Sequence, residues 1–412
     1  MSKNGGNRIL LFSRQPYAIT VAKLPKPLSL AGFEVGSLCL ERSFLWKSRY
    51  LDVRFSCPLN PRSLILKLIR IIRDWQPYLI IPGDPWSLHY LQRLAESRFI
   101  RFFPDIHQVL VRSLGNPKCI DLLASKQLLL QFAQELGVRQ PEDSKVDNVE
   151  VAKVYAKRNG YPVVVKQEYN SGGNGVWVCR DEVELVAAFG EAQFHKRSKG
   201  IAGMLRAAWS TYNRFPYAPE MNTGGQISIQ RFIEGMPALC SFVALEGSVL
   251  ASNIVERSLP YDGPTSPHCM YRSITNDEIE NAVHAIVKRT GFSGFGCFDF
   301  MIDSSGQAYL IECNPFPVNV AHLGNVLGKD LCLALYNKIT GRNRGDFVAV
   351  EKGRIVFLFP YELMRDPDSV NIVLYPSDIP LDEPELLRLM MRHFNIPADV
   401  IERIVNALNF RR

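Results

Sequence analysis

The stretch FDFMIDSSGQAYLIECNP, residues 298–315, alternates apolar and polar side chains on both sides of a central Ser-Gly pair. This pattern predicts two antiparallel strands joined by a two-residue turn. Counting outward from that turn places Asp299 directly opposite Glu312. Because side chains alternate between the two faces of a strand, Asn314 is expected on the same side.

Two carboxylates that face each other across a strand pair, with Cβ atoms about 5 Å apart, repel unless something positive lies between them. A bound cation is one explanation for Asp299 and Glu312. The alternative is a solvent-facing strand pair whose charges spread into water. The rest of the chain has to decide between the two.

The overall composition is that of an ordinary globular protein. With 412 residues, 47% apolar and 22% charged, the chain is long enough for two or three domains with sizeable cores. The net charge of +7 suits anionic small molecules such as nucleotides. The sequence contains no basic block with interleaved aromatic residues, so it does not predict nucleic-acid binding.

The cysteines and the apolar segments bear on where the chain works. The nine cysteines contain no CxxC pair, which favours free thiols in a reducing compartment and a cytoplasmic location. No apolar run approaches the ~20 residues of a membrane span, and the N-terminus lacks the apolar core of a signal peptide. The segment SLILKLIRIIRDW, residues 63–75, is read as a helix packed on a sheet in preference to one lying on a membrane surface.

The first hundred residues alternate strand and helix signals, which predicts a parallel α/β sheet. Strands are expected at 8–13, 33–40 and 77–84, and a helix at 16–31. Asp84 follows the third of these strands, at the edge where open α/β sheets bind ligands. The competing interpretation is that Asp84 caps the next helix.

From about residue 119 the signals change. Residues 121–138 read as one amphipathic helix ended by Gly137, and YPVVVKQEY, residues 161–169, reads as a strand that carries Lys166. The glycines of NSGGNGVWVC, residues 170–179, lie between two strands, so this is no P-loop. Such a hairpin can still fold over phosphates through its backbone N–H groups, and a buried lysine beside it needs an anionic partner.

Three later segments complete this interpretation of the sequence. QRFIEG, residues 230–235, predicts a turn between two sheets that could border an adenine ring. The basic segment 190–226 is read as an irregular insertion, either covering a site or, preferably, forming a solvated surface. A helix is expected after Thr275, with Glu278 completing a capping box, and Arg272 is expected in the loop before it.

Taken in order, these features resemble the ATP-grasp superfamily. The resemblance rests on a helical lysine before a GV..P turn, the VVVK strand, the glycine-rich hairpin, the QRFIEG linker and the DF…YLIECNP hairpin, and it covers roughly residues 119–341. It implies a Rossmann-like pre-ATP-grasp domain at 1–115 and a two-lobed ATP-grasp domain at 116–345, divided near 230. Residues 346–412 resemble the C-terminal tails of uncharacterised members that are carboxylate-amine ligase-like.

The resemblance also implies roles for particular residues. Nucleotide contacts would come from Lys126, Lys166, Ser171, Gly172, Gly173, Asn174, Gly175, Gln230, Arg231, Phe232 and Ile233. One or two Mg²⁺ ions, with Mn²⁺ as an alternative, would bind Asp299, Glu312 and Asn314. Catalytic stabilisation of an oxyanion would fall to Arg257 and Arg272.

The implied reaction joins a carboxylate to an amine, by way of an acyl phosphate, with release of ADP and phosphate. Phe316, Cys297 and Pro237 depart from patterns seen in relatives, which argues against a D-alanyl ligase or a biotin carboxylase. The alternatives are another nucleophile, a kinase-like phosphoryl transfer, or an ATP-binding sensor or scaffold without turnover. The partners expected are small carboxylates and amines, and a homodimer is compatible with this interpretation.

Overall fold

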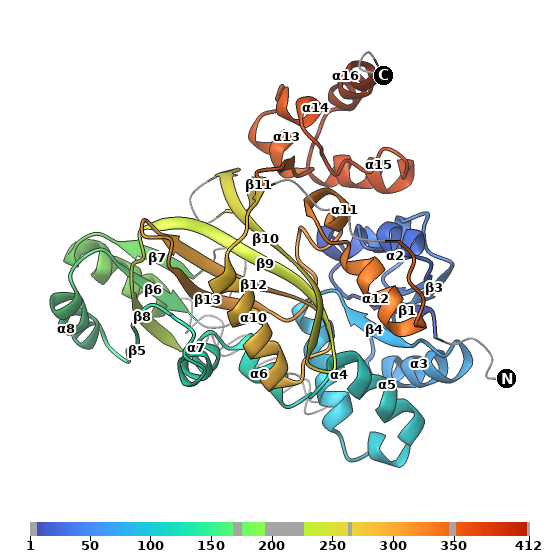
Figure 1. Cartoon of the computed structure of the whole chain (residues 1–412), viewed down its shortest axis with the longest axis horizontal. Helices are drawn as coiled ribbons and strands as arrows, with labels where there is room; N and C mark the ends of the chain where they lie inside the picture. Colours follow the sequence, from blue (N-terminus) through green and yellow to red (C-terminus); the bar gives the residue numbers. More distant parts are fainter. Residues whose placement is uncertain (1–5, 168–174, 194–225, 263–265, 346–351, 410–412) are drawn as a thin grey trace.

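The computed structural model describes residues 6–167, 175–193, 226–262, 266–345 and 352–409. Within them the chain forms three sheets (Figure 1). A parallel four-stranded sheet, an antiparallel six-stranded sheet and an antiparallel four-stranded sheet follow one another across the molecule. This arrangement confirms the expected combination of α/β and α+β folds.

The N-terminal domain is built on the parallel sheet, whose strand order is β3-β2-β1-β4. Its elements are β1 (Arg8–Phe12), α1 (Ile19–Ala22), α2 (Pro25–Ala31), β2 (Glu34–Cys39), η1 (Leu45–Lys47), β3 (Val53–Ser56), α3 (Pro61–Asp74), β4 (Leu79–Pro82), α4 (Pro85–Glu96), η2 (Ile100–Phe102) and α5 (Pro104–Leu114). Strand β3 was not expected from the sequence. The helix expected at 16–31 is wrong in its extent, because the chain forms the two short helices α1 and α2, and Pro25 starts the second of them.

Both faces of the parallel sheet are covered, as expected for such sheets. In β1, Leu10 and Phe12 belong to the core that contains α3, α4 and α5, whereas Ile9 and Leu11 belong to the core on the other face. The second core also takes in residues of α12 and of the C-terminal helices. The first and last parts of the sequence are therefore packed on each other.

The next part of the chain forms a separate lobe around the sheet β5-β8-β6-β7. Its elements are β5 (Asp143–Lys145), α8 (Val149–Asn159), β6 (Val163–Gln167), β7 (Val176–Cys179) and β8 (Ile227–Arg231), with a further helix at 182–193. The two helices that precede this lobe, α6 (Cys119–Ala124) and α7 (Lys126–Glu135), pack instead against the main core. The single helix expected at 121–138 is wrong: Ser125 adopts an extended conformation and accepts a hydrogen bond from the backbone N–H of Leu128 at 3.2 Å. Lys126 is consequently the first residue of a new helix.

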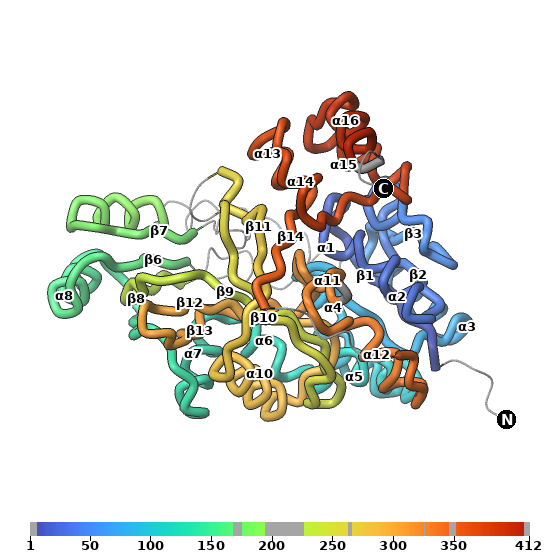
Figure 2. The backbone as a smooth tube through the Cα atoms, turned by 45° about the horizontal axis from the view of Figure 1, so that its top comes forward, coloured from blue at the N-terminus to red at the C-terminus, as the bar shows by residue number. Residues whose placement is uncertain are grey.

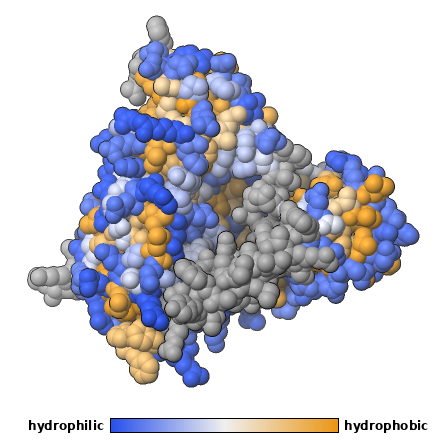
Figure 3. Space-filling view, turned by 180° about the vertical axis from the view of Figure 1, so that it is seen from behind, coloured by the Kyte–Doolittle hydropathy of each residue, from blue (hydrophilic) through white to orange (hydrophobic). Residues whose placement is uncertain are grey.

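This lobe carries an exposed apolar surface. In the view from behind, apolar side chains gather on the lobe at the right (Figure 3). The exposed valines of this lobe are Val151, Val154, Val183 and Val186. Among the described residues, no helix is both long and apolar enough to cross a membrane.

The central part of the chain forms the six-stranded sheet, in the order β13-β12-β9-β10-β11-β14. Its elements are β9 (Gly235–Leu245), β10 (Ser248–Pro260), β11 (His268–Ser273), α10 (Asp277–Thr290), β12 (Gly294–Asp303), β13 (Ala308–Asn314), α11 (Gly324–Leu327), α12 (Leu331–Thr340) and β14 (Ile355–Phe357). Two expectations are wrong here. Arg272 lies in strand β11 and not in a loop, and the cap of α10 is Asn276, whose side chain accepts a hydrogen bond from the N–H of Ile279 at 3.0 Å.

The C-terminal segment forms α13 (Tyr361–Arg365), α14 (Asn371–Leu374), α15 (Pro384–His393) and α16 (Ala398–Asn409). Figure 2 shows α15 beside the N-terminal domain, where it contacts η1. The contact includes the stacked rings of Tyr17 and His393, whose centroids are 4.0 Å apart. The division of the chain at about residues 115 and 345 stays a prediction.

Gly115 joins the N-terminal domain to the six-stranded sheet and provides a stability test. Its φ is +74°, and a Cβ added there would lie 1.9 Å from the carbonyl oxygen of Gly291. We expect Gly115→Ala to lower the free energy of unfolding by about 2–4 kcal/mol, from backbone strain and steric overlap together. Gly137 has a similar φ of +72° but open space around it. In urea denaturation, Gly137→Ala should cost only about 1–2 kcal/mol; equal losses would contradict the steric account.

Candidate active site

The hairpin of β12 and β13 pairs Asp299 with Glu312, as expected. The turn itself differs, because the N–H of Asp303 donates to the carbonyl of Gln307 at 3.0 Å, so three residues form the loop. The offset of one residue persists to the pair Phe300–Leu310 and is removed by a register shift beside Asp299. The predicted pairing is therefore right although the predicted turn is wrong, since a bulge compensates for the longer loop.

Both carboxylates have positively charged partners. A guanidinium nitrogen of Arg257, from β10, lies 3.1 Å from Asp299 Oδ1, and Lys126 Nζ lies 3.2 Å from Glu312 Oε2. Asn314 Nδ2 donates to Asp299 Oδ2 at 3.2 Å. Three of the predicted site residues thus lie on one face of the hairpin, and a lysine from α7 reaches them.

Lys166 brings a second lysine to the same place from the other lobe. It lies in β6 and is 7% exposed. Burial favours the neutral form of Glu312, but the charges of Lys126 and Lys166 outweigh this and lower the pKa of Glu312. The structure therefore gathers both predicted phosphate-binding lysines around the predicted metal-binding carboxylate.

Asp299 behaves in the opposite way. Burial raises its pKa to about 6, and the charge of Glu312 acts in the same direction against the opposing Arg257 and Lys126. Its Oδ1 is buried and, despite the ion pair with Arg257, has no partner with hydrogen-bond geometry among the described residues. The carboxylate is thus held between a guanidinium and a second carboxylate, with one oxygen incompletely satisfied.

The oxygen atoms of Asp299, Glu312 and Asn314 fit a hard divalent cation, which prefers carboxylate and amide oxygens. Within the described part of the chain, no group of three His, Cys, Asp or Glu side chains is placed to hold a metal ion, so a cation at the hairpin would need the Asn314 amide beside the two carboxylates. Arg257 and Lys126 already contact the two carboxylates. A cation bound here would have to share these carboxylates with them or displace them.

Arg272 is not brought together with this cluster. In the pairing of β10 with β11, Arg257 lies opposite Tyr271 whereas Arg272 lies opposite Glu256. Successive residues of a strand point to opposite faces, so Arg272 lies on the face away from Arg257. A guanidinium nitrogen of Arg272 lies 3.2 Å from Glu256. Of the two arginines predicted to be catalytic, Arg257 alone contacts the carboxylates.

The glycine-rich hairpin is described only in part. Ser171, Gly172, Gly173 and Asn174 lie outside the described residues. Gly175 has a φ of +74°, and its carbonyl accepts a hydrogen bond from the N–H of Gln167 at 2.8 Å. The described end of the hairpin is therefore paired with Gln167, the last residue of the strand that carries Lys166.

The linker between the lobes borders a cavity of about 430 Å³. Its lining residues are Pro162, Arg231, Phe232, Ile233, Glu234, Asp303 and Tyr309. The linker residues predicted to border adenine thus face the tip of the β12–β13 hairpin. Gln230 precedes them, is 2% exposed, and has a side-chain nitrogen without a hydrogen-bond partner among the described residues.

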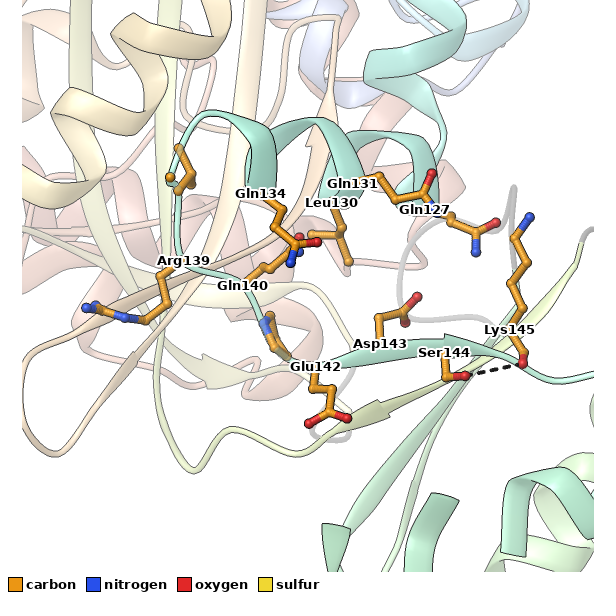
Figure 4. A pocket seen from close by; sticks show the side chains of 13 residues that line it. Gln127, Leu130, Gln131, Gln134, Arg139, Gln140, Glu142, Asp143, Ser144 and Lys145 are labelled. Carbon is orange, nitrogen blue, oxygen red and sulfur yellow. Dashed lines mark hydrogen bonds between the residues drawn. The ribbon is translucent and has the colours of Figure 1, made fainter. Parts of the chain in front are cut away.

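A second cavity, of about 900 Å³, lies between α7 and β5 (Figure 4). The side chains of Gln127, Gln131 and Gln134 line it from α7. Asp143 lines it from β5, in register with Gln230 of β8. The sequence reading missed this polar lining. The signal was present, since the three glutamines are spaced by four and three residues along one helix face.

Two residues close to the hairpin, Cys297 and Phe316, depart from the patterns of relatives and have structural roles here. Cys297 is 1% exposed and belongs to the core that contains Leu239, Val255 and Tyr271. Phe316 is partly buried and packs against the main core. Both side chains occupy apolar surroundings beside the site.

Part of the sequence matches a known family. Residues 125–204 match the family described as the carbamoyl-phosphate synthase L chain, ATP binding domain. The carbamoyl phosphate synthase large chain of Campylobacter jejuni is 36% identical over 169 residues, which is 37% of this chain and 15% of that protein. The chain spans only 15% to 17% of the length of the curated relatives it matches.

Two solved structures extend the likeness to most of the chain. One is the biotin carboxylase domain dimer of 2-oxoglutarate carboxylase from Hydrogenobacter thermophilus, in complex with MgADP, ADP and bicarbonate; the TM-score is 0.56 at 20% identity, over 85% of this chain and 73% of that chain. The other is an L-amino acid ligase from Bacillus licheniformis, with a TM-score of 0.53 at 15% identity, over 81% of this chain and 74% of that chain. The chain therefore has the ATP-grasp fold, which confirms the resemblance read from its sequence.

Proposed function

We propose that the chain is an ATP-dependent ligase that activates a carboxylate as an acyl phosphate and couples it to an amine, with release of ADP and phosphate. The observation that carries this proposal is the meeting of Lys126, Lys166, Asp299, Glu312 and Asn314 at one place between two lobes. Cations from two directions and oxygen ligands on one strand pair are what a nucleotide triphosphate with its metal ion requires. The likeness to an L-amino acid ligase supports the amine as acceptor.

Each part of the site would then have a distinct task. The linker residues Arg231, Phe232 and Ile233 would hold the adenine in the cavity of about 430 Å³. Lys126 and Lys166 would bind the phosphates and offset their charge, so that an anionic carboxylate could approach the γ-phosphorus. Mg²⁺ held by Asp299, Glu312 and Asn314 would supply further neutralisation of that charge.

Arg257 would steady the oxyanion formed when the amine attacks the acyl phosphate. The guanidinium stays charged, because the carboxylate of Asp299 outweighs its burial and raises the pKa of Arg257. Its Nε is buried and has no hydrogen-bond partner among the described residues. A donor that is already buried and lies next to the carboxylate cluster suits this task. The catalytic role of Arg272 stays a prediction, and this residue does not contact the carboxylate cluster.

Hydroxylamine tests the acyl phosphate directly, because it attacks such a group and leaves a hydroxamate. The protein would be incubated with Mg-ATP, hydroxylamine and each acid of a panel of amino acids, hydroxy acids and dicarboxylates. The proposal expects hydroxamate and ADP in equal amounts with at least one acid. ADP without hydroxamate across the panel would instead favour phosphoryl transfer to a hydroxyl group.

The pH dependence of metal binding gives a separate prediction. Because the pKa of Asp299 is raised to about 6, the carboxylate is largely protonated at pH 5 and charged at pH 7. We expect the affinity for Mn²⁺ in the presence of ADP to rise by up to about tenfold per pH unit below pH 6 and to level off above it. Electron paramagnetic resonance of free Mn²⁺ would measure this. Asp299→Asn should remove the part of the slope that belongs to this group, and an unchanged slope would contradict the assignment.

A nucleotide-binding protein without turnover is the second candidate. The ion pairs Arg257–Asp299 and Lys126–Glu312 favour it, because they neutralise the carboxylates without a metal ion. This candidate predicts tight ATP binding with no ADP formed from any substrate pair.

Location and assembly belong to the same proposal. All nine cysteines are free, which suits the reducing cytoplasm. A homodimer is proposed by analogy with the biotin carboxylase domain dimer. Sedimentation of the full chain at two concentrations would test the homodimer.

A further inference from the structure

The loop after β1 is held in place by a buried carboxylate. Asp84, 1% exposed, is the N-cap of α4, so the capping interpretation of this residue is confirmed. Its Oδ2 also accepts hydrogen bonds from the hydroxyl of Ser13 at 2.7 Å and from the N–H of Arg14 at 2.8 Å. Asp84 thereby fixes two loops, one after β1 and one after β4, and sets the position of Arg14.

The side chain of Arg14 carries a charge without a matching carboxylate. The residue is partly buried, and its guanidinium lies over the ring of Trp86 at 4.3 Å from the centroid. Trp86 in turn stacks on Tyr90, with centroids 4.9 Å apart. No carboxylate of the described residues lies within ion-pair distance of Arg14. A guanidinium stacked on an aromatic ring still presents its N–H edge to an anion.

The Cys57 thiol and the Tyr90 hydroxyl, two titratable groups beside Arg14, do not supply a negative charge. Burial raises the pKa of the Cys57 thiol to about 11, although Arg14 opposes the shift. Burial likewise raises the pKa of the Tyr90 hydroxyl. Both groups are neutral near pH 7. The oxygens of Asp84 are occupied by the loop donors and by Ser87, whose N–H donates to Oδ1 at 2.8 Å.

Arg14 also lies just beyond the carboxyl end of β1. Strands β1 and β4 are parallel neighbours, and β2 lies on the other side of β1. The order in which strands are added to the sheet therefore reverses between β1 and β4. Open α/β sheets bind ligands at the carboxyl ends of such strands. Farther along the chain, Lys23 at the end of α1 and His322 in the segment after β13 both contact Asp378 Oδ2, at 2.5 and 2.9 Å. This shared partner brings the segments that follow β1 and β13 to one place in the fold.

We infer that Arg14 binds a second anionic group, a carboxylate or a phosphate, on the acid that the ligase activates. The identification of the anion as part of the substrate rests on the proposed function, whereas the binding of an anion by Arg14 does not. Trp86 and Tyr90 would form an apolar wall beside the anion, and Asp84 would hold Arg14 in position. Acids with one anionic group would then be poor substrates, because they leave the guanidinium unpaired.

The test uses two simple anions, glutarate and inorganic phosphate, without nucleotide. Tryptophan fluorescence of the full chain would report binding beside Trp86, and Trp86→Phe would establish that this residue gives the signal. We expect a saturable change for at least one probe, with the dissociation constant raised at least tenfold in Arg14→Gln. Arg101→Gln removes an exposed arginine elsewhere in the same domain and should titrate like the parent.

The comparison with Lys126→Gln separates the inference from the proposed function. Phosphate bound at the nucleotide site would be weakened in that variant, whereas binding at Arg14 would persist. A response to glutarate alone assigns a carboxylate, and one to phosphate alone assigns a phosphate. Titrations that are identical in the parent and in Arg14→Gln, or a parent that shows no saturable change, would overturn the inference. Retained binding in a protein without ligase activity would uphold it and remove the proposed function.

Discussion

Glu312→Gln should reduce substrate-dependent ADP release by on the order of 100-fold, with little change in fold. The carboxylate lies 3.2 Å from Lys126 and lies opposite Asp299 in the hairpin. The amide keeps the shape of the side chain and removes its charge, so both the metal ligand and the partner of Lys126 are weakened. ADP formation with a productive acid and amine, measured by a coupled assay, gives the rate.

A surface variant provides the control for this prediction. Glu280 forms a surface ion pair with Lys329 at 3.5 Å, and Glu280→Gln should leave ADP release unchanged. Circular dichroism of both variants should match the parent. If Glu312→Gln releases ADP at the parental rate while its fold is intact, the carboxylate has no part in the chemistry and the metal assignment fails with it.

Lys23→Met should lower the free energy of unfolding by about 3–5 kcal/mol. Lys23 Nζ contacts Asp378 Oδ2 at 2.5 Å and donates to the carbonyl of Phe359 at 2.7 Å. Both charged side chains are almost completely buried, with 5% and 3% exposed. Removing the lysine leaves the Asp378 carboxylate buried, with His322 as its remaining side-chain partner among the described residues. Urea denaturation of the variant would measure the loss.

Lys26→Met is the matched control. Lys26 pairs with Asp382 at 2.9 Å, but these side chains are 43% and 35% exposed, so its loss should cost at most about 1 kcal/mol. The double variant Lys23→Met with Asp378→Leu should recover much of the stability, because no buried charge is left alone. A loss in Lys23→Met no larger than in Lys26→Met would contradict the account of a buried pair that ties the two ends of the chain together.

The hairpin shows how far sequence reasoning reaches. The alternation of residues 298–315 was enough to place Asp299 opposite Glu312 and Asn314 on the same face. The loop length and the bulge beside Asp299 could not be predicted from this alternation, because both depend on packing within the sheet. The two errors of one residue cancelled, so the predicted pairing of Asp299 with Glu312 is right.

Helix boundaries depended on similarly local choices. The apolar spacing of residues 121–138 continues through Ser125, so the sequence predicted one helix; the serine caps a second helix instead. This change matters for function, because it makes Lys126 the first residue of α7, from where its side chain reaches Glu312.

Contacts between distant segments could not be predicted. Arg257 and Arg272 looked equivalent in the sequence, and the strand pairing of β10 with β11 alone separates them by face. The pairing of Lys23 with Asp378 likewise joins residues that no periodicity connects. Positive charge between the carboxylates was expected, but Arg257 was not foreseen as one of its sources.

The most direct test of the central claim is ADP release with Mg-ATP across a matrix of carboxylic acids and amines, measured for the parent and for Asp299→Asn. The account predicts that one acid and one amine together raise ADP release well above the rate with either alone. It also predicts that Asp299→Asn loses this increase. ATP binding in the parent with no pair raising ADP release above the substrate-free rate would contradict the ligase and leave a nucleotide-binding protein.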